Sequence, residues 1–204
     1  MYSIEDGTFL VRLARAAIER HLHEGASTSP PKDTPDKLKK KAGVFVTLET
    51  WPEKKLRGCI GYPEPVFPLV DATCKMAVSA AAEDPRFPPL SEGELERTLV
   101  EVTVLTPPEL IKVASPKEYA NNIEIGRDGL IVEKGPTRGL LLPQVPVDQG
   151  WNKEDFLSHT CIKAGLPADC WLDEDTKIYK FSGIVFTEVE PQGEIKERTL
   201  ASTS

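Results

Sequence analysis

Arg57 and Cys59 lie two residues apart in the segment LRGCIG, residues 56–61. If this segment is a strand, the two side chains share one face and are about 7 Å apart. A cation at that distance favours the thiolate, which is the nucleophilic form of cysteine. The glycines of the segment leave space for a ligand or another backbone to approach. The pattern predicts a reactive Cys59 with a lowered pKa; the alternative is a packed, structural cysteine, since free cysteines are often buried.

Asp84 and Arg86 stand in a second segment of interest, DPRFPPL at residues 84–90. Its three prolines make this loop rigid and end the preceding helix. The two opposite charges either pair with each other or with a helix end, or they contribute to the same site as Cys59. A helix over 68–83 rises about 24 Å and returns the chain across the sheet. We therefore expect Asp84 and Arg86 to converge with Arg57 and Cys59 on one ligand-sized volume.

A cysteine nucleophile usually works with a base, and this chain offers no obvious one. Its three histidines lie on predicted helices with no evident reason to approach Cys59. Lys163 and Glu101 are weaker candidates for that role. A papain-like arrangement is accordingly not expected.

The four cysteines form no CxxC pair, which indicates reduced thiols and no disulfide. His159, Cys161 and Cys170 could ligate zinc, but their spacing matches no zinc motif, so no metal is expected. The sequence also lacks GxGxxG after a strand, a Walker loop, HExxH and GxSxG. It therefore identifies no cofactor.

The chain has 204 residues, 40% of them apolar, which suits one substantial core or two small ones. Asp and Glu total 32 against 25 Lys and Arg, and this net charge of −7 argues against nucleic-acid binding. No segment approaches the roughly 18 apolar residues of a membrane span, and no signal-peptide pattern is present. We expect a cytoplasmic protein without a membrane partner.

The elements that must position these side chains follow from periodicity. A polar tail from Pro191 onward is expected to be frayed. Strands grouped in hairpins with helices inserted between them indicate an α+β fold. Apolar periodicity predicts helices over 10–22, 68–83 and 152–164, and strands over 44–48, 56–61, 98–105, 123–125, 129–133, 139–142 and 178–189.

Four of these segments together resemble the AMMECR-one domain family, and a fifth resembles its archaeal branch. The family motifs are LRGCIG at 56–61, DPRFPPL at 84–90, GRDGL at 126–130 and GLLLP at 139–143; the archaeal one is CWLDED at 170–175. The resemblance implies two-layer α/β sandwiches with mainly antiparallel sheets, in two domains of unequal size with a cleft between them. The implied larger domain comprises 1–35 plus 98–204, and the smaller comprises 36–97 with the LRGCIG motif.

The resemblance names no reaction, but proteins of this kind are fused to, or encoded beside, Memo-like and radical SAM proteins. It therefore implies a shared pathway on a small molecule, with binding or chemistry at a cleft around Arg57 and Cys59. The alternative is a non-catalytic module that recruits a protein partner, for example a Memo-like protein. A polar, concave site with an exposed Cys59 sulfur favours the enzyme, and a sulfur buried among apolar atoms favours the module. A homo-oligomer is compatible with both.

Overall fold

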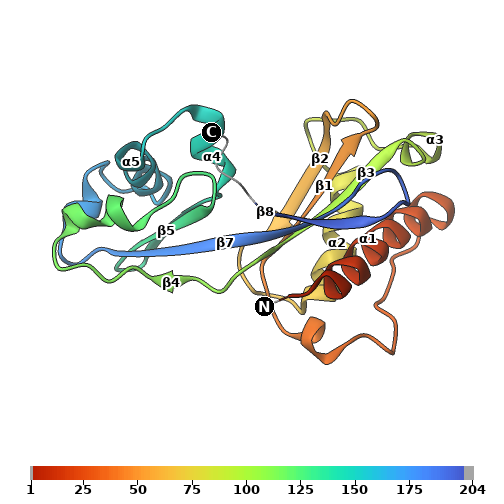
Figure 1. The fold of residues 1–204 in the computed structure, drawn as a ribbon, viewed down its shortest axis with the longest axis horizontal. Coiled ribbons are helices and arrows are strands. Elements are labelled where there is room, and N and C mark those ends of the chain that lie inside the picture. Colours follow the sequence, from red (N-terminus) through yellow and green to blue (C-terminus); the bar gives the residue numbers. More distant parts are fainter. Residues whose placement is uncertain (1, 200–204) are drawn as a thin grey trace. The chain divides into compact units, whose positions relative to one another are not determined.

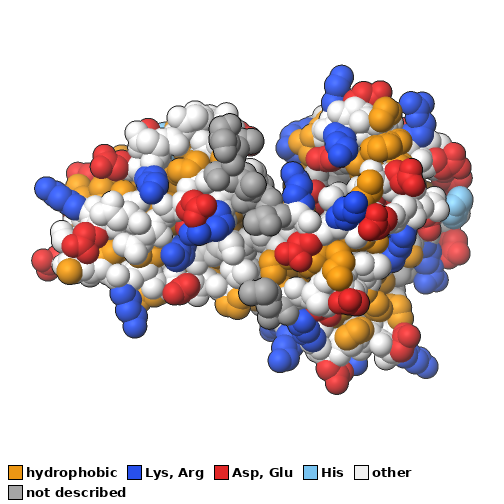
Figure 2. All heavy atoms as spheres, viewed as in Figure 1, with side chains coloured by type: hydrophobic (Ala, Val, Ile, Leu, Met, Phe, Trp, Pro, Cys, Tyr) orange, Lys and Arg blue, Asp and Glu red, His pale blue; other side chains and the backbone are white. Residues whose placement is uncertain are grey.

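In the computed structural model, which describes residues 2–199, the chain divides into two compact units (Figure 1). Unit 1 comprises the residues up to Leu105 together with Ile184–Arg198, and unit 2 comprises Thr106–Gly183. Among the described residues, no helix has the length and apolar content needed to cross a bilayer. Acidic and basic side chains are interspersed over the face drawn in Figure 2.

Unit 1 is built on a sheet whose strands come from both ends of its sequence. These strands are β1 (Val44–Thr50), β2 (Leu56–Tyr62), β3 (Thr98–Leu105), the second half of β7 (Lys177–Glu188), and β8 (Ile195–Thr199). The strand order is β2-β1-β3-β7, and β8 also pairs with β7. β1 is antiparallel to both of its neighbours, and Thr47 lies opposite Cys59 on β2 and Glu101 on β3.

Two helices cover one face of this sheet, α1 (Ile4–Glu24) and α2 (Leu69–Ala82). α1 begins with a capping box between Ser3 and Asp6 and ends at Gly25, whose φ of 63° suits glycine. α2 lies so close to β2 that a Cβ on Gly58 would stand 2.2 Å from the carbonyl oxygen of Ala80. Gly58 lies opposite Leu48 and faces the helix, whereas Cys59 lies opposite Thr47 and points to the other face; the register of the pair shifts at Arg57, which has no partner on β1.

A buried ion pair joins α1 to the end of β7. Arg15 donates to both carboxylate oxygens of Glu188, at 2.8 and 2.5 Å. It also donates to the carbonyl oxygens of Leu95, at 3.2 Å, and Thr98, at 2.6 Å. Glu188 accepts the Val100 N–H at 3.0 Å. This network fixes the start of β3 and the short helix α3 (Glu92–Leu95) against α1.

Unit 2 is a second antiparallel sheet with helical segments and its own core. Its elements are β4 (Glu109–Leu110), β5 (Asp128–Lys134), β6 (Thr137–Leu141), the first half of β7, α4 (Gln144–Gln149), α5 (Lys153–Lys163), and the 3-10 helices η2 (Pro116–Asn122) and η3 (Cys170–Leu172). β7 pairs with β4 and β5, and β5 pairs with β6. Phe156 and Leu157 of α5 pack on Leu130 and Val132 of β5.

The predicted α+β class with antiparallel sheets is confirmed, but three expectations are wrong. Residues 36–97 do not separate from the rest of unit 1, because β1 pairs with β3 over seven residues. No strand forms at 123–125, where a turn is held by the Glu124 N–H donating to Asp128 at 2.9 Å. Within the tail after Pro191, Ile195–Thr199 forms β8 and does not fray, and residues 200–204 lie outside the described part of the chain. The cleft between two domains stays a prediction.

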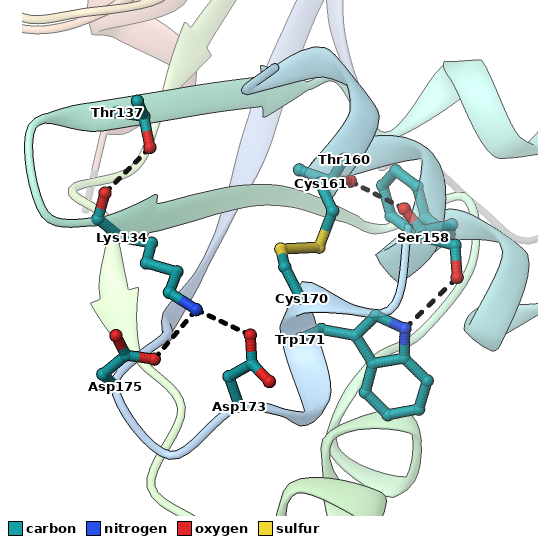
Figure 3. The surroundings of a disulfide bond; sticks show 10 residues. Lys134, Thr137, Ser158, Thr160, Cys161, Cys170, Trp171, Asp173 and Asp175 are labelled. Atoms are coloured by element: carbon teal, nitrogen blue, oxygen red, sulfur yellow. Dashed lines mark hydrogen bonds and ion pairs between the residues drawn. A yellow bond between two sulfur atoms is a disulfide. The ribbon is translucent and has the colours of Figure 1, made fainter. Parts of the chain in front are cut away.

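The expectation of reduced thiols is wrong for one pair, because Cys161 of α5 and Cys170 of η3 form a disulfide (Figure 3). The turn after α5 brings their Cα atoms to 6.1 Å, within the usual range for a bridge. Cys59 and Cys74 are free. Since both sulfurs are bonded to each other, this pair is not available as zinc ligands, and no metal-ligand cluster occurs within residues 2–199.

Polar contacts around the disulfide hold the same segment in place. Lys134 of β5 lies between two carboxylates of the segment after η3, at 2.6 Å from Asp173 and 3.1 Å from Asp175 (Figure 3). The indole N–H of Trp171 donates to the Ser158 hydroxyl on α5 at 3.2 Å. The segment that resembles the archaeal branch is therefore tied to α5 and to β5.

Candidate functional site

Asp84 and Arg86 lie beside Cys59, but they contact its backbone and not its thiol. β2 is an end strand of the sheet order, so its outer N–H and C=O groups need partners. The Cys59 N–H donates to Asp84 at 2.8 Å, and the Cys59 carbonyl accepts from the Arg86 guanidinium at 3.2 Å. Asp84 also accepts from Arg86 at 2.7 Å, and this bond holds the pKa of Asp84 well below its usual range. The loop thus caps the edge of β2.

The Cys59 thiol lies half-buried and accepts a hydrogen bond from the Thr47 hydroxyl at 3.4 Å. Burial raises the pKa of Cys59 above its usual value. The charges of Glu101 and Asp84 raise this pKa as well. The Thr47 hydrogen bond and the Arg86 charge lower it, but the effect of burial is larger. Burial therefore opposes the predicted thiolate, and Arg57 is not among the groups that shift the pKa of Cys59.

Glu101 shares the sheet face of Cys59, on the far side of Thr47. It is 6% exposed, and its carboxylate accepts from Arg198 at 2.8 Å. Burial raises the pKa of Glu101. Cys59, Thr47 and Glu101 form a row of thiol, hydroxyl and carboxyl groups across β2, β1 and β3, which we call the polar row. Lys163, the other candidate base, is exposed on α5 in unit 2.

Arg57 is engaged by a partner that the sequence analysis did not identify. Its side chain is 10% exposed, and it donates to both carboxylate oxygens of Glu94, at 3.2 and 3.3 Å. Its guanidinium also lies 5.8 Å from the centre of the Phe87 ring, and the guanidinium of Arg86 lies 5.5 Å from the same ring. Phe87 therefore links Arg57 to the loop that caps Cys59. An aromatic residue within a proline-rich loop was the available signal for this role.

A pocket of about 530 Å³ opens beside Arg57 within unit 1. Its walls come from the β1–β2 hairpin on one side and from α3 and the start of β3 on the other. Cys59, Asp84 and Arg86 are not among its lining residues, so only Arg57 of the four predicted residues reaches it. The pocket, which we call the Arg57 pocket, is lined by Thr50, Trp51, Glu53, Lys55, Arg57, Ser91, Gly93, Glu94, Arg97 and Thr98.

We expect Cys59 to react slowly with iodoacetamide at pH 7.5, more slowly than the same thiol in the urea-unfolded protein. The raised pKa leaves less thiolate at neutral pH, so the alkylation rate should rise as the pH passes above 9. Mass spectrometry of alkylation against pH measures this, with Cys59→Ser to identify the site. Arg57→Ala should leave the rate nearly unchanged, because Arg57 pairs with Glu94. Faster alkylation of the folded than of the unfolded protein at pH 7.5 would contradict the assignment.

Comparisons with known proteins relate this chain to archaeal relatives over nearly its whole length. The AMMECR1 family model matches residues 11–186. Protein PH0010 of Pyrococcus horikoshii is 57% identical over 205 residues, covering 98% of this chain and 99% of that protein. Protein MJ0810 of Methanocaldococcus jannaschii is 54% identical over 200 residues, covering 98% of each. The crystal structure of the uncharacterized PH0010 protein matches with a TM-score of 0.79 and 58% identity, over 95% of this chain and 96% of that one.

Proposed function

This chain belongs to the AMMECR1 family, and we propose that it binds a small metabolite in the Arg57 pocket. One observation carries the proposal. Arg57 belongs to the LRGCIG motif and is 8% exposed, yet it forms part of the wall of a pocket of about 530 Å³. A volume of this size lies in the range of small-molecule sites.

Hydrogen bonds within both walls of the Arg57 pocket hold its shape, which supports a binding role. β1 and β2 form a hairpin in which the Lys55 N–H donates to the Thr50 hydroxyl at 3.2 Å. Ser91 and Glu94 form a capping box at the start of α3. Since Glu94 also holds Arg57, the guanidinium is oriented before any ligand arrives. A preorganised donor loses less conformational entropy on binding.

The polar row places acid–base groups on the sheet face that carries Cys59. Because the pKa of Cys59 is raised, the thiol keeps its proton at neutral pH and acts as a hydrogen-bond or proton donor rather than a nucleophile. The raised pKa of Glu101 brings this carboxyl closer to the range in which it can hold and release a proton. The polar row does not line the Arg57 pocket, so the proposal is one of binding and names no reaction.

A second candidate function is that of a binding module that recruits a protein partner. The contacts of Asp84 and Arg86 favour it, because both side chains are occupied with the edge of β2 and with each other. These residues then serve the fold and not a reaction. A Memo-like protein is the partner to test, in a pathway that includes radical SAM proteins.

A ligand-detected NMR screen of metabolite mixtures tests the proposal. We expect at least one metabolite to bind the wild-type protein, with affinity reduced about tenfold by Arg57→Lys, because lysine lacks the planar two-donor fork. Arg20→Lys is the matched control, since Arg20 is exposed on α1 and pairs with Glu24. If no metabolite binds and a Memo-like protein co-elutes with the wild-type chain, the metabolite-binding proposal is wrong and the protein-recruiting module is the better interpretation.

A further inference from the structure

We infer that the ligand of the Arg57 pocket is an anion joined to a flat ring, with its phosphate or carboxylate against Lys55, Arg57 and Arg97 and its ring on Trp51. This inference rests on the proposed function and adds the chemical class of the ligand. Three features support it: the excess of basic side chains in the pocket, the N–H donors that remain available on these side chains, and the presence of Trp51 in the pocket wall.

The charge of the pocket is opposite in sign to that of the chain. Its lining includes Lys55, Arg57 and Arg97 against Glu53 and Glu94, whereas the whole chain has 32 acidic and 25 basic residues. A concave surface with an excess of one sign of charge concentrates ligands of the other sign. An anion is therefore the ligand that this pocket attracts.

Two of the three basic groups are available to a ligand. The side chains of Lys55 and Arg97 form no ion pair with any residue in the range 2–199 and are exposed at the pocket. Arg57 is already paired, but Glu94 takes two of the five N–H donors of its guanidinium. Arginine can therefore hold Glu94 and a ligand oxygen at the same time.

The contact between Arg57 and Glu94 does not use the full hydrogen-bonding capacity of either group. Its distances of 3.2 and 3.3 Å are longer than the roughly 2.7–2.9 Å of a strong charge-assisted bond. Glu94 has other partners, since it accepts from the Ser91 N–H at 3.0 Å and the Ser91 hydroxyl at 3.1 Å. A ligand anion can thus accept from the remaining donors of Arg57 while Glu94 keeps its bonds to Arg57 and Ser91.

Trp51 places an aromatic surface next to these cations. It is half-buried in the pocket wall, and its backbone N–H donates to the carbonyl oxygen of Arg97 at 2.8 Å. This bond places the backbones of Trp51 and Arg97 side by side, and both residues line the pocket. A flat ring can stack on the indole while an attached anion reaches the basic groups.

The test uses four small probes on the full chain: phenyl phosphate, benzoate, inorganic phosphate and phenol. Isothermal titration gives the affinities, and the shift of the Trp51 indole N–H resonance, assigned with Trp51→Phe, gives the location. We expect phenyl phosphate or benzoate to bind at least tenfold more tightly than phenol, and the affinity to fall as salt is added. Preference for either anion supports the inference and identifies the anionic group.

Variants of exposed pocket residues test the anionic part and the ring of the ligand separately. Arg97→Gln and Lys55→Gln should each weaken phenyl phosphate several-fold, and Arg20→Gln should not. Trp51→Ala should reduce the affinity for phenyl phosphate to that for inorganic phosphate. Glu94→Gln should tighten anion binding, because it removes the competing carboxylate.

The outcomes distinguish this inference from the proposed function. If phenol binds as tightly as phenyl phosphate and Arg97→Gln has no effect, the inference that the ligand carries an anionic group is wrong. If Trp51→Ala leaves the affinity for phenyl phosphate unchanged, the inference that a ring of the ligand stacks on Trp51 is wrong. A neutral metabolite that binds through Arg57 in the screen overturns the inference and upholds the proposed function, whereas failure of every probe and every metabolite overturns both.

Discussion

Replacing Glu188 with alanine is expected to lower the free energy of unfolding by about 3–5 kcal/mol, because it leaves Arg15 buried without its counter-charge. The side chains of Arg15 and Glu188 are 4% and 0% exposed. Glu188→Ala also leaves the Val100 N–H without the acceptor that it has at 3.0 Å. Urea unfolding at pH 7, followed by circular dichroism, measures the change.

An exposed ion pair on the same helix provides the control. Glu24→Ala removes its ion pair with Arg20, in which the side chain of Glu24 is 60% exposed and that of Arg20 is 50% exposed. This change should alter the free energy of unfolding by less than about 0.5 kcal/mol. The double variant Arg15→Met with Glu188→Leu should recover much of the loss, because it removes both charges from the interior. A loss below about 1 kcal/mol for Glu188→Ala would show that water reaches Arg15 and would contradict its burial.

The same ion pair connects the core to the Arg57 pocket. Arg15 donates to the carbonyl oxygens of Leu95 and Thr98, which stand on either side of Arg97 in the sequence. Thr98 itself lines the pocket. The buried arginine thus fixes the backbone from which one of the two unpaired cations projects, and the geometry of the pocket depends on a residue on α1 that does not line it.

Local periodicity was enough to predict most of the elements that carry the site. The alternation in 98–105 predicted β3, and the apolar stripe from Leu10 to Leu22 predicted the middle of α1. The length of the helix before Asp84 predicted that its loop returns to Cys59, and Asp84 does contact the Cys59 N–H. Each of these predictions depends on a repeat or a length that can be read within one segment.

The pairing of charges could not be predicted in the same way. Alternation placed Arg57 and Cys59 on one face, but Arg57 pairs with Glu94, 37 positions further along the chain. Burial of the thiol, which decides the direction of the Cys59 pKa shift, also depends on the packing of other strands. β8 was missed because Ile195–Thr199 is rich in charged residues, and its strand conformation depends on its pairing with β7.

The disulfide was missed for a different reason, because its two cysteines lie on a helix and a 3-10 helix that are brought together by the turn after α5. A spacing of nine positions matches no short motif, and the expected cytoplasmic setting argued for thiols. Both cysteines are buried, Cys161 at 0% and Cys170 at 1% exposure. The bridge therefore forms part of the core of unit 2 and not of its surface.

Reduction of this disulfide is expected to lower the free energy of unfolding by about 2–4 kcal/mol. The reason is that the unfolded chain gains conformational entropy when the covalent loop between the two cysteines is opened. Urea unfolding with and without a phosphine reductant measures the change. A thiol assay on the unfolded protein should count Cys59 and Cys74 alone before reduction. The double variant Cys161→Ala with Cys170→Ala is the control, since the reductant should no longer affect its stability. Equal stability of the oxidised and reduced wild-type proteins would mean that packing of Trp171 and the Lys134 ion pairs holds η3 on α5 without the bridge.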